Sequence, residues 1–458
     1  MVCGECFRFM SEIVTLHATM MRQFELKIGR TTARFSLPEN HLLYNLVGRN
    51  VEPPADLAGA YRRALDHPID SPPLSELVKP GETVVITVSD ITRAWQRNDL
   101  TLPVLVNYLN EAGIPDENIT IIIAVGAHRQ NSAAECAELC GQEVYERVRV
   151  INHNAWDTDN IVYLGTTSRG TEVALNREAV AADRVILTGG VIYHYMVGYG
   201  GGRKSVMPGI ASLRTIQQSH MWAMRPTVGE GTNPLAANMK TIGNPAHEDM
   251  MDVASFLRPD FIVNMVPNLD GDIAGIFAGN WVSAWLAATR MVDDTFGVDI
   301  EEQADIVIAS AGGYPKDINL YQSQKTIDNA LYAMKPGGVI ILLAECPDIT
   351  EPREFFDWFS YPSFIEMEQA VRENFLISGW VAVRQWEYSN QGTTIMVTSR
   401  ENIELAARAR VTGVTSIQEA LQLAYETCGT TEPKITVMPQ GANTFPILRT
   451  QPEGGGNP

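Results

Sequence analysis

One stretch decides how the chain is organised: Thr188-Gly-Gly-Val-Ile-Tyr-His-Tyr-Met-Val-Gly-Tyr-Gly-Gly-Gly-Arg-Lys-Ser-Val-Met-Pro-Gly209. The apolar residues 184–188, which lead into this stretch, predict a short buried strand. Too many glycines follow for a regular element, and glycine lets a backbone take positive φ and approach a ligand closely. Because Lys204 adds a positive charge near His194, we expect an anion-binding loop at the end of a strand. A flexible surface turn is the alternative, although turns seldom need so many glycines.

A phosphate-binding P-loop is a near match to part of this stretch. Residues 198–205 have the length of that motif and end in Lys204 and Ser205. The glycine that should precede the lysine is Arg203, so the motif fails where the backbone must come closest to phosphate. Nucleotide hydrolysis is therefore disfavoured.

Composition sets the class of protein. The 458 residues are long enough for two or three domains, and 45% hydrophobic with 19% charged residues is ordinary for a globular protein. A formal charge of −19 argues against nucleic acid or an anionic membrane as partner, but not against a small anionic substrate. No apolar run approaches the ~20 residues that span a bilayer, and no secretory signal is evident. We therefore expect a cytoplasmic protein.

The cysteines give no metal signature. Cys3 and Cys6 form a single Cys-x-x-Cys without a second pair at zinc spacing, and we place them in an N-terminal extension, residues 1–23. Cys136 and Cys140 lie four apart on an expected helix, where small buried residues are the expected role.

Two further strand-end loops carry polar side chains. Residues 83–88 predict a buried strand, and Ser89, Asp90, Thr92 and Arg93 follow it. Residues 119–125 predict another, followed by His128. The carboxyl ends of parallel strands face the ligand crevice of such a sheet, so these side chains are placed to hold an anion. A helix-capping loop explains Ser89 and Asp90 but gives no reason for Arg93, and a lone histidine is often structural.

The strand–helix pattern restarts near residue 290. Residues 305–310 and 338–344 predict strands, and between them Tyr321, Gln322 and Lys325 recur at helical spacing near a helix start, where an anion is favoured. A solvated helix face is the alternative. We expect an α/β fold with two domains of mostly parallel sheets flanked by helices and an active site in the cleft between them. The expected limits are 24–288 and 289–431, with 432–450 as a candidate return to the first domain and 451–458 as a tail.

Four motif clusters occur together, and they resemble those of the nickel-pincer lactate racemase family from about Phe24 to Leu448. The clusters are Ser-Asp-x-Thr-Arg at 89–93, Gly-x-His-Arg at 126–129, Gly-Gly-Gly-Arg-Lys-x-x-x-Pro-Gly-Ile at 200–210, and Tyr-Gln-x-x-Lys at 321–325. His194 stands ten residues before Lys204, and His220 sixteen after it. Ala94 stands where the family usually has proline.

The resemblance implies roles for individual residues. Lys204 would tether a nickel pincer nucleotide, the pyridinium-3-thioamide-5-thiocarboxylic acid mononucleotide, and His220 would be a nickel ligand. His128 and His194 would be the two catalytic acid/base groups. The substrate-binding residues would be Arg93, Tyr321, Gln322 and Lys325, and further cofactor contacts would come from Asp90, Thr92, Gly201 and Gly202. Accessory proteins that build the cofactor would be partners.

The implied reaction is racemisation of D- and L-2-hydroxyacids, with lactate as the first-choice substrate. The pKa of an α-hydrogen beside a carboxylate lies far beyond any side-chain base, so hydride removal with a bound 2-keto acid is the implied route. Alternatives are a family member acting on malate, a sugar acid or phenyllactate, a zinc hydrolase, and a sensor of a nucleotide-like ligand. His-x-x-x-His spacing with a carboxylate is missing from the sequence, which disfavours zinc hydrolysis.

Overall fold

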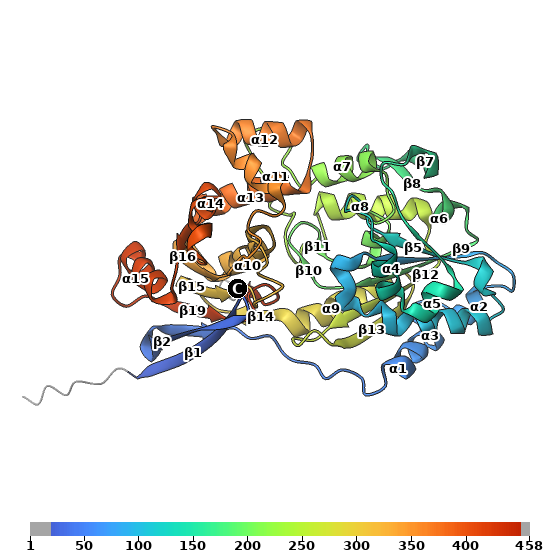
Figure 1. Cartoon of the computed structure of the whole chain (residues 1–458), viewed down its shortest axis with the longest axis horizontal. Helices are drawn as coiled ribbons and strands as arrows, with labels where there is room; N and C mark the ends of the chain where they lie inside the picture. Colours follow the sequence, from blue (N-terminus) through green and yellow to red (C-terminus); the bar gives the residue numbers. More distant parts are fainter. Residues whose placement is uncertain (1–19, 450–458) are drawn as a thin grey trace, which may run out of the picture.

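The computed structural model describes residues 20–449 and shows two lobes, each built around a six-stranded sheet (Figure 1). The first lobe comprises the elements from α1 to α9. The second lobe comprises β1 to β3 together with β14 to β20 and α10 to α15. The predicted α/β class is confirmed. Cys3 and Cys6 lie outside the described residues.

The sheet of the first lobe has the order β13-β12-β9-β4-β5-β6, and every neighbouring pair is parallel except β12 with β13. Its inner strands are nearly continuous β-branched runs because helices cover both faces. The strands are β4 (Val84–Ser89), β5 (Ile119–Ala124), β6 (Arg149–Asn152), β9 (Arg184–Gly190), β12 (Phe261–Pro267) and β13 (Ile273–Gly279). Two hairpins accompany it: β7 (Ile161–Thr166) with β8 (Glu172–Asn176), and β10 (Tyr193–His194) with β11 (Gly198–Tyr199).

Several helices of the first lobe begin at side-chain caps. Ser132 and Glu135 form a capping box at the start of α4, worth about 1 kcal/mol. Asn244 caps α8, with Pro245 in its first turn. The helices are α1 (Leu57–Asp66), α2 (Leu74–Leu77), α3 (Asn98–Glu111), α4 (Ala133–Cys140), α5 (Gln142–Arg147), α6 (Arg177–Ala181), α7 (Leu213–Met221), α8 (Pro245–Leu257) and α9 (Ser283–Phe296).

The sheet of the second lobe is parallel throughout, in the order β18-β17-β16-β15-β19-β3. Its strands are β3 (Leu42–Asn45), β15 (Ala304–Ser310), β16 (Met334–Leu343), β17 (Thr393–Val397), β18 (Thr412–Val414) and β19 (Ile435–Met438). Paired strands outside it are β1 (Met21–Ile28) with β2 (Thr31–Pro38), and β14 (Gly297–Ile300) with β20 (Phe445–Leu448). The helices are α10 (Leu320–Ala333), α11 (Arg353–Asp357), α12 (Phe364–Glu373), α13 (Ile377–Gln391), α14 (Ile403–Arg408) and α15 (Ile417–Cys428).

Strand pairing assigns the chain ends differently from the expected domain limits. β1 and β2 pack on the second lobe, where Phe24 and Phe35 join the core with Ile306 and Ile341. β19 lies between β15 and β3, so residues 432–450 do not return to the first sheet. Apolar patterns identify strands but not their partners, because pairing across hundreds of residues depends on tertiary packing.

The lobes are in direct contact. Tyr195 of the first lobe and Trp380 of the second belong to one buried apolar cluster, with ring centroids 5.2 Å apart. Figure 1 shows α10 facing the β10–β11 hairpin across this contact. The two walls of the predicted cleft are therefore packed against each other near these elements. Among residues 20–449, no helix is both long and apolar enough to cross a membrane.

Candidate active site

A carboxylate–histidine pair joins two strand-end loops of the first lobe. Asp90 follows β4, and its Oδ2 lies 2.5 Å from Nδ1 of His128, which follows β5. Burial opposes ionisation of Asp90, but its hydrogen bond to His128 and that residue's charge keep the pKa of the carboxyl below its ordinary value. An ionised Asp90 accepts the Nδ1 proton and leaves Nε2 of His128 as the free acceptor. The side chain of His128 is 54% exposed, so Nε2 can receive a proton from a ligand.

Thr92 and Arg93 continue the loop after Asp90. Asp90 caps the short 3-10 helix Ile91–Gln96 by accepting from the backbone amide of Thr92. Arg93 breaks the helical conformation within that segment, and its guanidinium donates to the hydroxyl and carbonyl of Thr92. No carboxylate is paired with Arg93 among the described residues. Its free donors can therefore take a substrate carboxylate.

The β10–β11 hairpin brings His194 next to Lys204. The backbone amide of Met196 donates to Nδ1 of His194, so Nε2 faces Lys204, whose Nζ is 3.4 Å away. Burial, then the charges of Arg203 and Arg93, lowers the pKa of Lys204 to about 7. Burial and the charge of Lys204 also hold the pKa of His194 well below its ordinary value. Near neutral pH the pair therefore offers a neutral imidazole and an amine with a substantial neutral fraction.

Arg203 explains why the loop is not a P-loop. Its side chain is fully buried and donates to the carbonyls of Val197 and Tyr199, at 2.7 and 2.9 Å. The guanidinium also lies 4.6 Å from the ring centroid of Trp285. Arg203 thus holds the glycine-rich turn from inside.

The two predicted cofactor glycines are required by packing in the structure. Gly201 and Gly202 have φ of +63° and +57°, where side chains are disfavoured. A Cβ on Gly201 would lie 2.7 Å from Val191, and one on Gly202 2.6 Å from Trp285. The amide of Gly202 donates to Asn264 and so faces inward. Contacts of these glycines with a cofactor stay predictions.

One ring nitrogen of His220 is held by the backbone of its own helix. His220 lies in the last turn of α7, and its Nδ1 is 2.7 Å from the carbonyl oxygen of Ile216. Because Nδ1 donates there, the lone pair of Nε2 is available. Burial, then the charge of Lys204, lowers the pKa of His220 to about 4, so the ring is neutral at physiological pH. Phe375 of the second lobe stacks on it at 5.8 Å.

The described part of the chain offers no complete protein-only metal site. No group of three or more His, Cys, Asp or Glu side chains is gathered there in a way that could hold an ion. A metal on His220 would thus need most of its ligands from an organic group. A part-buried amine such as Lys204, whose charge reaches that histidine, fits a tethered cofactor of this kind.

Helix α10 supplies the second wall. It begins at Leu320, so Tyr321, Gln322 and Lys325 lie in its first turns, and Asn319 caps it at the backbone amide of Gln322. Lys325 donates to the side-chain carbonyl of Gln322 at 2.8 Å. Burial, then the charge of Arg93, lowers the pKa of Lys325 to about 7. Tyr321 packs against Phe355, and burial raises its pKa to about 12.

Electrostatics connects the predicted residues across the two lobes. The charge of Arg93 lowers the pKa of Lys204 in the first lobe and of Lys325 in the second. The pKa of His194 is lowered by the charges of both Lys204 and Lys325. The charge of Arg93 therefore reaches His194, Lys204 and Lys325, and that of Lys204 reaches His220. His128 is linked to this group through Asp90, which feels the charges of both His128 and Arg93.

Two residues at the site carried no recognised sequence signal. Trp380 of α13 packs on Tyr195, the neighbour of His194, and donates its indole N–H to the carbonyl of Ala223. Asp293 of α9 accepts hydrogen bonds from the hydroxyls of Tyr193 and Tyr199, the cross-strand pair of the His194 hairpin. Neither lies in a motif, and only the folded chain brings them to the hairpin.

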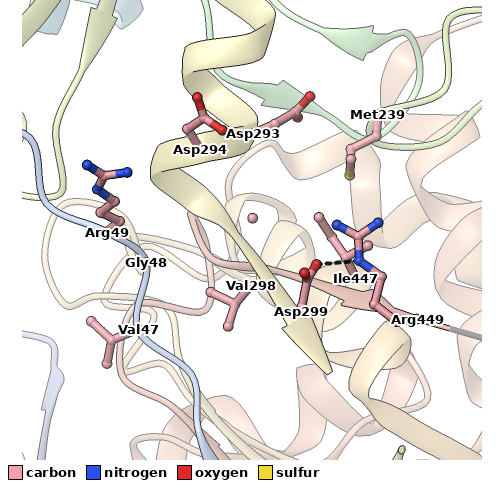
Figure 2. Close-up of a pocket in the computed structure, with 11 residues that line it drawn as sticks. Val47, Gly48, Arg49, Met239, Asp293, Asp294, Val298, Asp299, Ile447 and Arg449 are labelled. Carbon is pink, nitrogen blue, oxygen red and sulfur yellow. Dashed lines mark ion pairs between the residues drawn. The ribbon is translucent and has the colours of Figure 1, made fainter. Parts of the chain in front are cut away.

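Asp293 also borders a hollow of about 700 Å³, shown in Figure 2. The hollow is lined by the segments that connect the lobes, including Gly48, Arg49 and Gly297, and by the ion pair of Asp299 with Arg449. None of the predicted site residues lines it. It lies at the crossing between the lobes and is not the candidate active site.

Comparisons with known proteins agree with this arrangement. Residues 28–231 match the family model "Lactate racemase N-terminal domain", and residues 300–445 match "Lactate racemase C-terminal domain". Lactate racemase of Thermoanaerobacterium thermosaccharolyticum is 31% identical over 93% of this chain and 99% of its own length. That of Lactiplantibacillus plantarum is 30% identical over 83% of this chain and 88% of its own.

Solved structures show the same fold. The lactate racemase apoprotein from T. thermosaccharolyticum superposes with a TM-score of 0.84 at 30% identity, covering 93% of this chain and 100% of that one. A protein from Thermotoga maritima gives a TM-score of 0.63 at 15% identity, covering 88% of this chain and 100% of that one. The second likeness concerns the fold alone.

Proposed function

Because this chain belongs to the lactate racemase family, we propose that it interconverts D- and L-2-hydroxyacids, with lactate as the first-choice substrate. We further propose that Lys204 tethers a nickel pincer nucleotide and that His220 is the protein ligand of its nickel. When bound, this cofactor supplies a reversible hydride acceptor for the C2 hydrogen of the substrate. One observation carries the proposal: Nε2 of His194 lies 3.4 Å from Nζ of Lys204, so a proton-carrying imidazole stands beside the tether.

The residues of the cleft divide the remaining work. Arg93, Lys325 and Gln322 bind the substrate carboxylate, because cationic and amide donors from both lobes converge there. With the carboxylate held, the 2-keto form can turn and expose its other face.

Two histidines are needed because D- and L-enantiomers present their hydroxyl groups on opposite sides. His128 and His194 lie on separate strand-end loops, and each takes or returns the hydroxyl proton on its own side. Asp90 orients His128 and stabilises its protonated form during turnover. The low pKa of His194 favours return of its proton.

The first experiment is co-expression with the accessory proteins that build the cofactor, which are the proposed partners. Intact mass should show an adduct that is lost in Lys204→Arg, a variant that keeps the positive charge but cannot form the same bond. Metal analysis should find nickel that is lost in His220→Ala. Chiral chromatography of D- and L-lactate, with malate in parallel, should show interconversion by the loaded protein. An unmodified mass without nickel after co-expression would overturn the cofactor assignment. Conversion of malate but not of lactate would overturn the assignment of lactate as the substrate.

A further inference from the structure

The connection between α7 and α8 belongs to the first lobe in sequence but is bonded to the second. Glu368 of α12 accepts from the amides of Gly229 and Gly231, and Glu387 of α13 accepts from Thr232. Asn238 makes the last of these contacts, and its side chain is hydrogen-bonded to α10. This residue is 4% exposed. It lies between the hairpin that carries His194 and the helix that carries Lys325.

On one side, the backbone at Asn238 lies against the His194 hairpin. Asn238 forms a parallel bridge with Gly198, and the following amide, that of Met239, donates to the carbonyl of Gly198. Gly198 is the strand partner of His194. A Cβ on Gly198 would lie 2.6 Å from the carbonyl oxygen of Lys240, so the two backbones are in close contact. The position of Asn238 is thus tied to that of His194 by main-chain geometry.

On the other side, the side chain of Asn238 is bonded to α10. Its amide nitrogen donates to Oδ2 of Asp328 and to Oδ1 of Asn329, both at 3.0 Å. Asn329 uses its own amide for the carbonyl of Gly441, so its oxygen is the atom left to face Asn238. Both acceptors stand one helical turn after Lys325.

Asp328 is itself held firmly. Its other carboxylate oxygen receives the guanidinium of Arg384 and the hydroxyl of Tyr388, both from α13. These side chains are buried, so the acceptor that Asn238 uses has one fixed place in the second lobe. A buried carboxylate also requires a hydrogen-bond donor at the position of Asn238, and a side chain that only fills the space would leave it unpaired.

We propose that Asn238 is a positioning residue that sets the offset between His194 in one lobe and Lys325 in the other. The inference rests on the proposed function, in which Lys325 holds the substrate carboxylate and His194 handles the hydroxyl proton of the same molecule. Their separation decides whether both can act at once. A misplacement of about 1 Å at a distant residue can lower a rate by about 100-fold.

The kinetic test compares Asn238→Ala and Asn238→Asp with a control. Both variants should lower kcat about tenfold or more and change KM for lactate by less than about threefold, because Lys325 and Gln322 stay together on α10. Aspartate is isosteric but removes the donor and faces Asp328, so its loss should equal or exceed that of alanine. A near-normal Asn238→Asp would show that only the shape matters and would overturn the proposal.

Gln217→Ala is the matched control. Gln217 also donates a side-chain amide across the lobes, to the carbonyl of Phe375, and within residues 20–449 it makes no side-chain hydrogen bond to α10. It should leave kcat within about twofold. An equal loss of kcat in Gln217→Ala would show that weakening any contact between the lobes lowers the rate. That result would contradict a specific role for Asn238.

Two readouts separate positioning from a simple loss of folded protein. The kinetic isotope effect with 2-deuterated lactate should rise in Asn238→Ala, because cleavage of the C2–H bond becomes slower relative to the other steps, whereas a smaller active fraction would leave it unchanged. Hydrogen–deuterium exchange of the unloaded protein should increase in the peptide of residues 320–329 in Asn238→Ala but not in Gln217→Ala. Unchanged exchange in α10 would overturn the proposal whether or not the wild type racemises lactate. Increased exchange with an inactive wild type would retain the positioning contact and remove the proposed function.

Discussion

Asp90 places a carboxylate oxygen 2.5 Å from Nδ1 of His128, although 38 residues separate them in sequence. They meet because each follows a strand of the same parallel sheet, β4 or β5. The relation assigns the Nδ1 proton of His128 and leaves Nε2 free. An unpaired imidazole would exchange between two tautomers, only one of which can accept a proton from the ligand side.

Asp90→Asn tests this assignment. The asparagine keeps the oxygen that caps Thr92 but can turn its NH₂ toward His128 and favour the other tautomer. We expect racemisation to fall by about 10²–10⁴, as for triad histidines that lose their orienting carboxylate. The free energy of unfolding should change by less than about 1 kcal/mol, because the cap is retained. Asp157→Asn, at another helix cap with no contact to the site, is the control.

Lys325→Met tests the cost of burying an ammonium group. The pKa of Lys325 is lowered to about 7, so between pH 7 and its unfolded value of about 10.4 the unfolded chain binds more protons than the folded one. Wild-type stability should therefore gain from this residue as the pH rises through that window. The Tm of Lys325→Met should exceed that of the wild type most at pH 6–7, and the difference should shrink toward pH 10. A constant difference at every pH, measured by calorimetry, would contradict the assignment.

Arg203→Lys tests the inner support of the glycine-rich turn. Lysine keeps a charge but cannot donate in the planar fork that reaches Val197 and Tyr199 together. The free energy of unfolding, from urea titration, should fall by about 2–4 kcal/mol. Arg214→Lys, at an exposed ion pair, should cost less than about 1 kcal/mol. Equal losses in the two variants would contradict the proposed support.

Gly202→Ala tests close packing separately from backbone conformation. Gly202 and Gly429 both have positive φ, +57° and +65°, but a Cβ on Gly429 meets nothing within 4 Å, whereas one on Gly202 meets Trp285. Gly429→Ala should therefore cost only the conformational penalty, about 1 kcal/mol. Gly202→Ala should cost at least about 2 kcal/mol more. Similar unfolding midpoints for the two variants would show that the Trp285 side chain moves aside at little cost in free energy.

Local sequence patterns predicted which helices and strands form better than they predicted where each one begins and ends. The strands that precede Arg93, His128 and His194 appear as expected, because continuous β-branched runs are typical of strands buried on both faces. Residues 353–373 are divided into α11, a 3-10 turn and α12, and Pro362 lies at the break. Cys136 and Cys140 are buried free thiols, as predicted.

The sequence by itself determined the chemistry available at each strand end: the arginine after β4, the histidine after β5, and the glycine-rich turn with its lysine after β9. These are local properties, since an apolar run, a glycine or a capping side chain acts within a few residues of itself. Only the tertiary structure decided which ends meet. Pairing of β19 with β15, the Asp293 contact to two tyrosines and the bridge from Asn238 to α10 each join segments about 90 or more residues apart. Such contacts form because burial and hydrogen bonding of the whole chain favour one arrangement, and no local pattern encodes them.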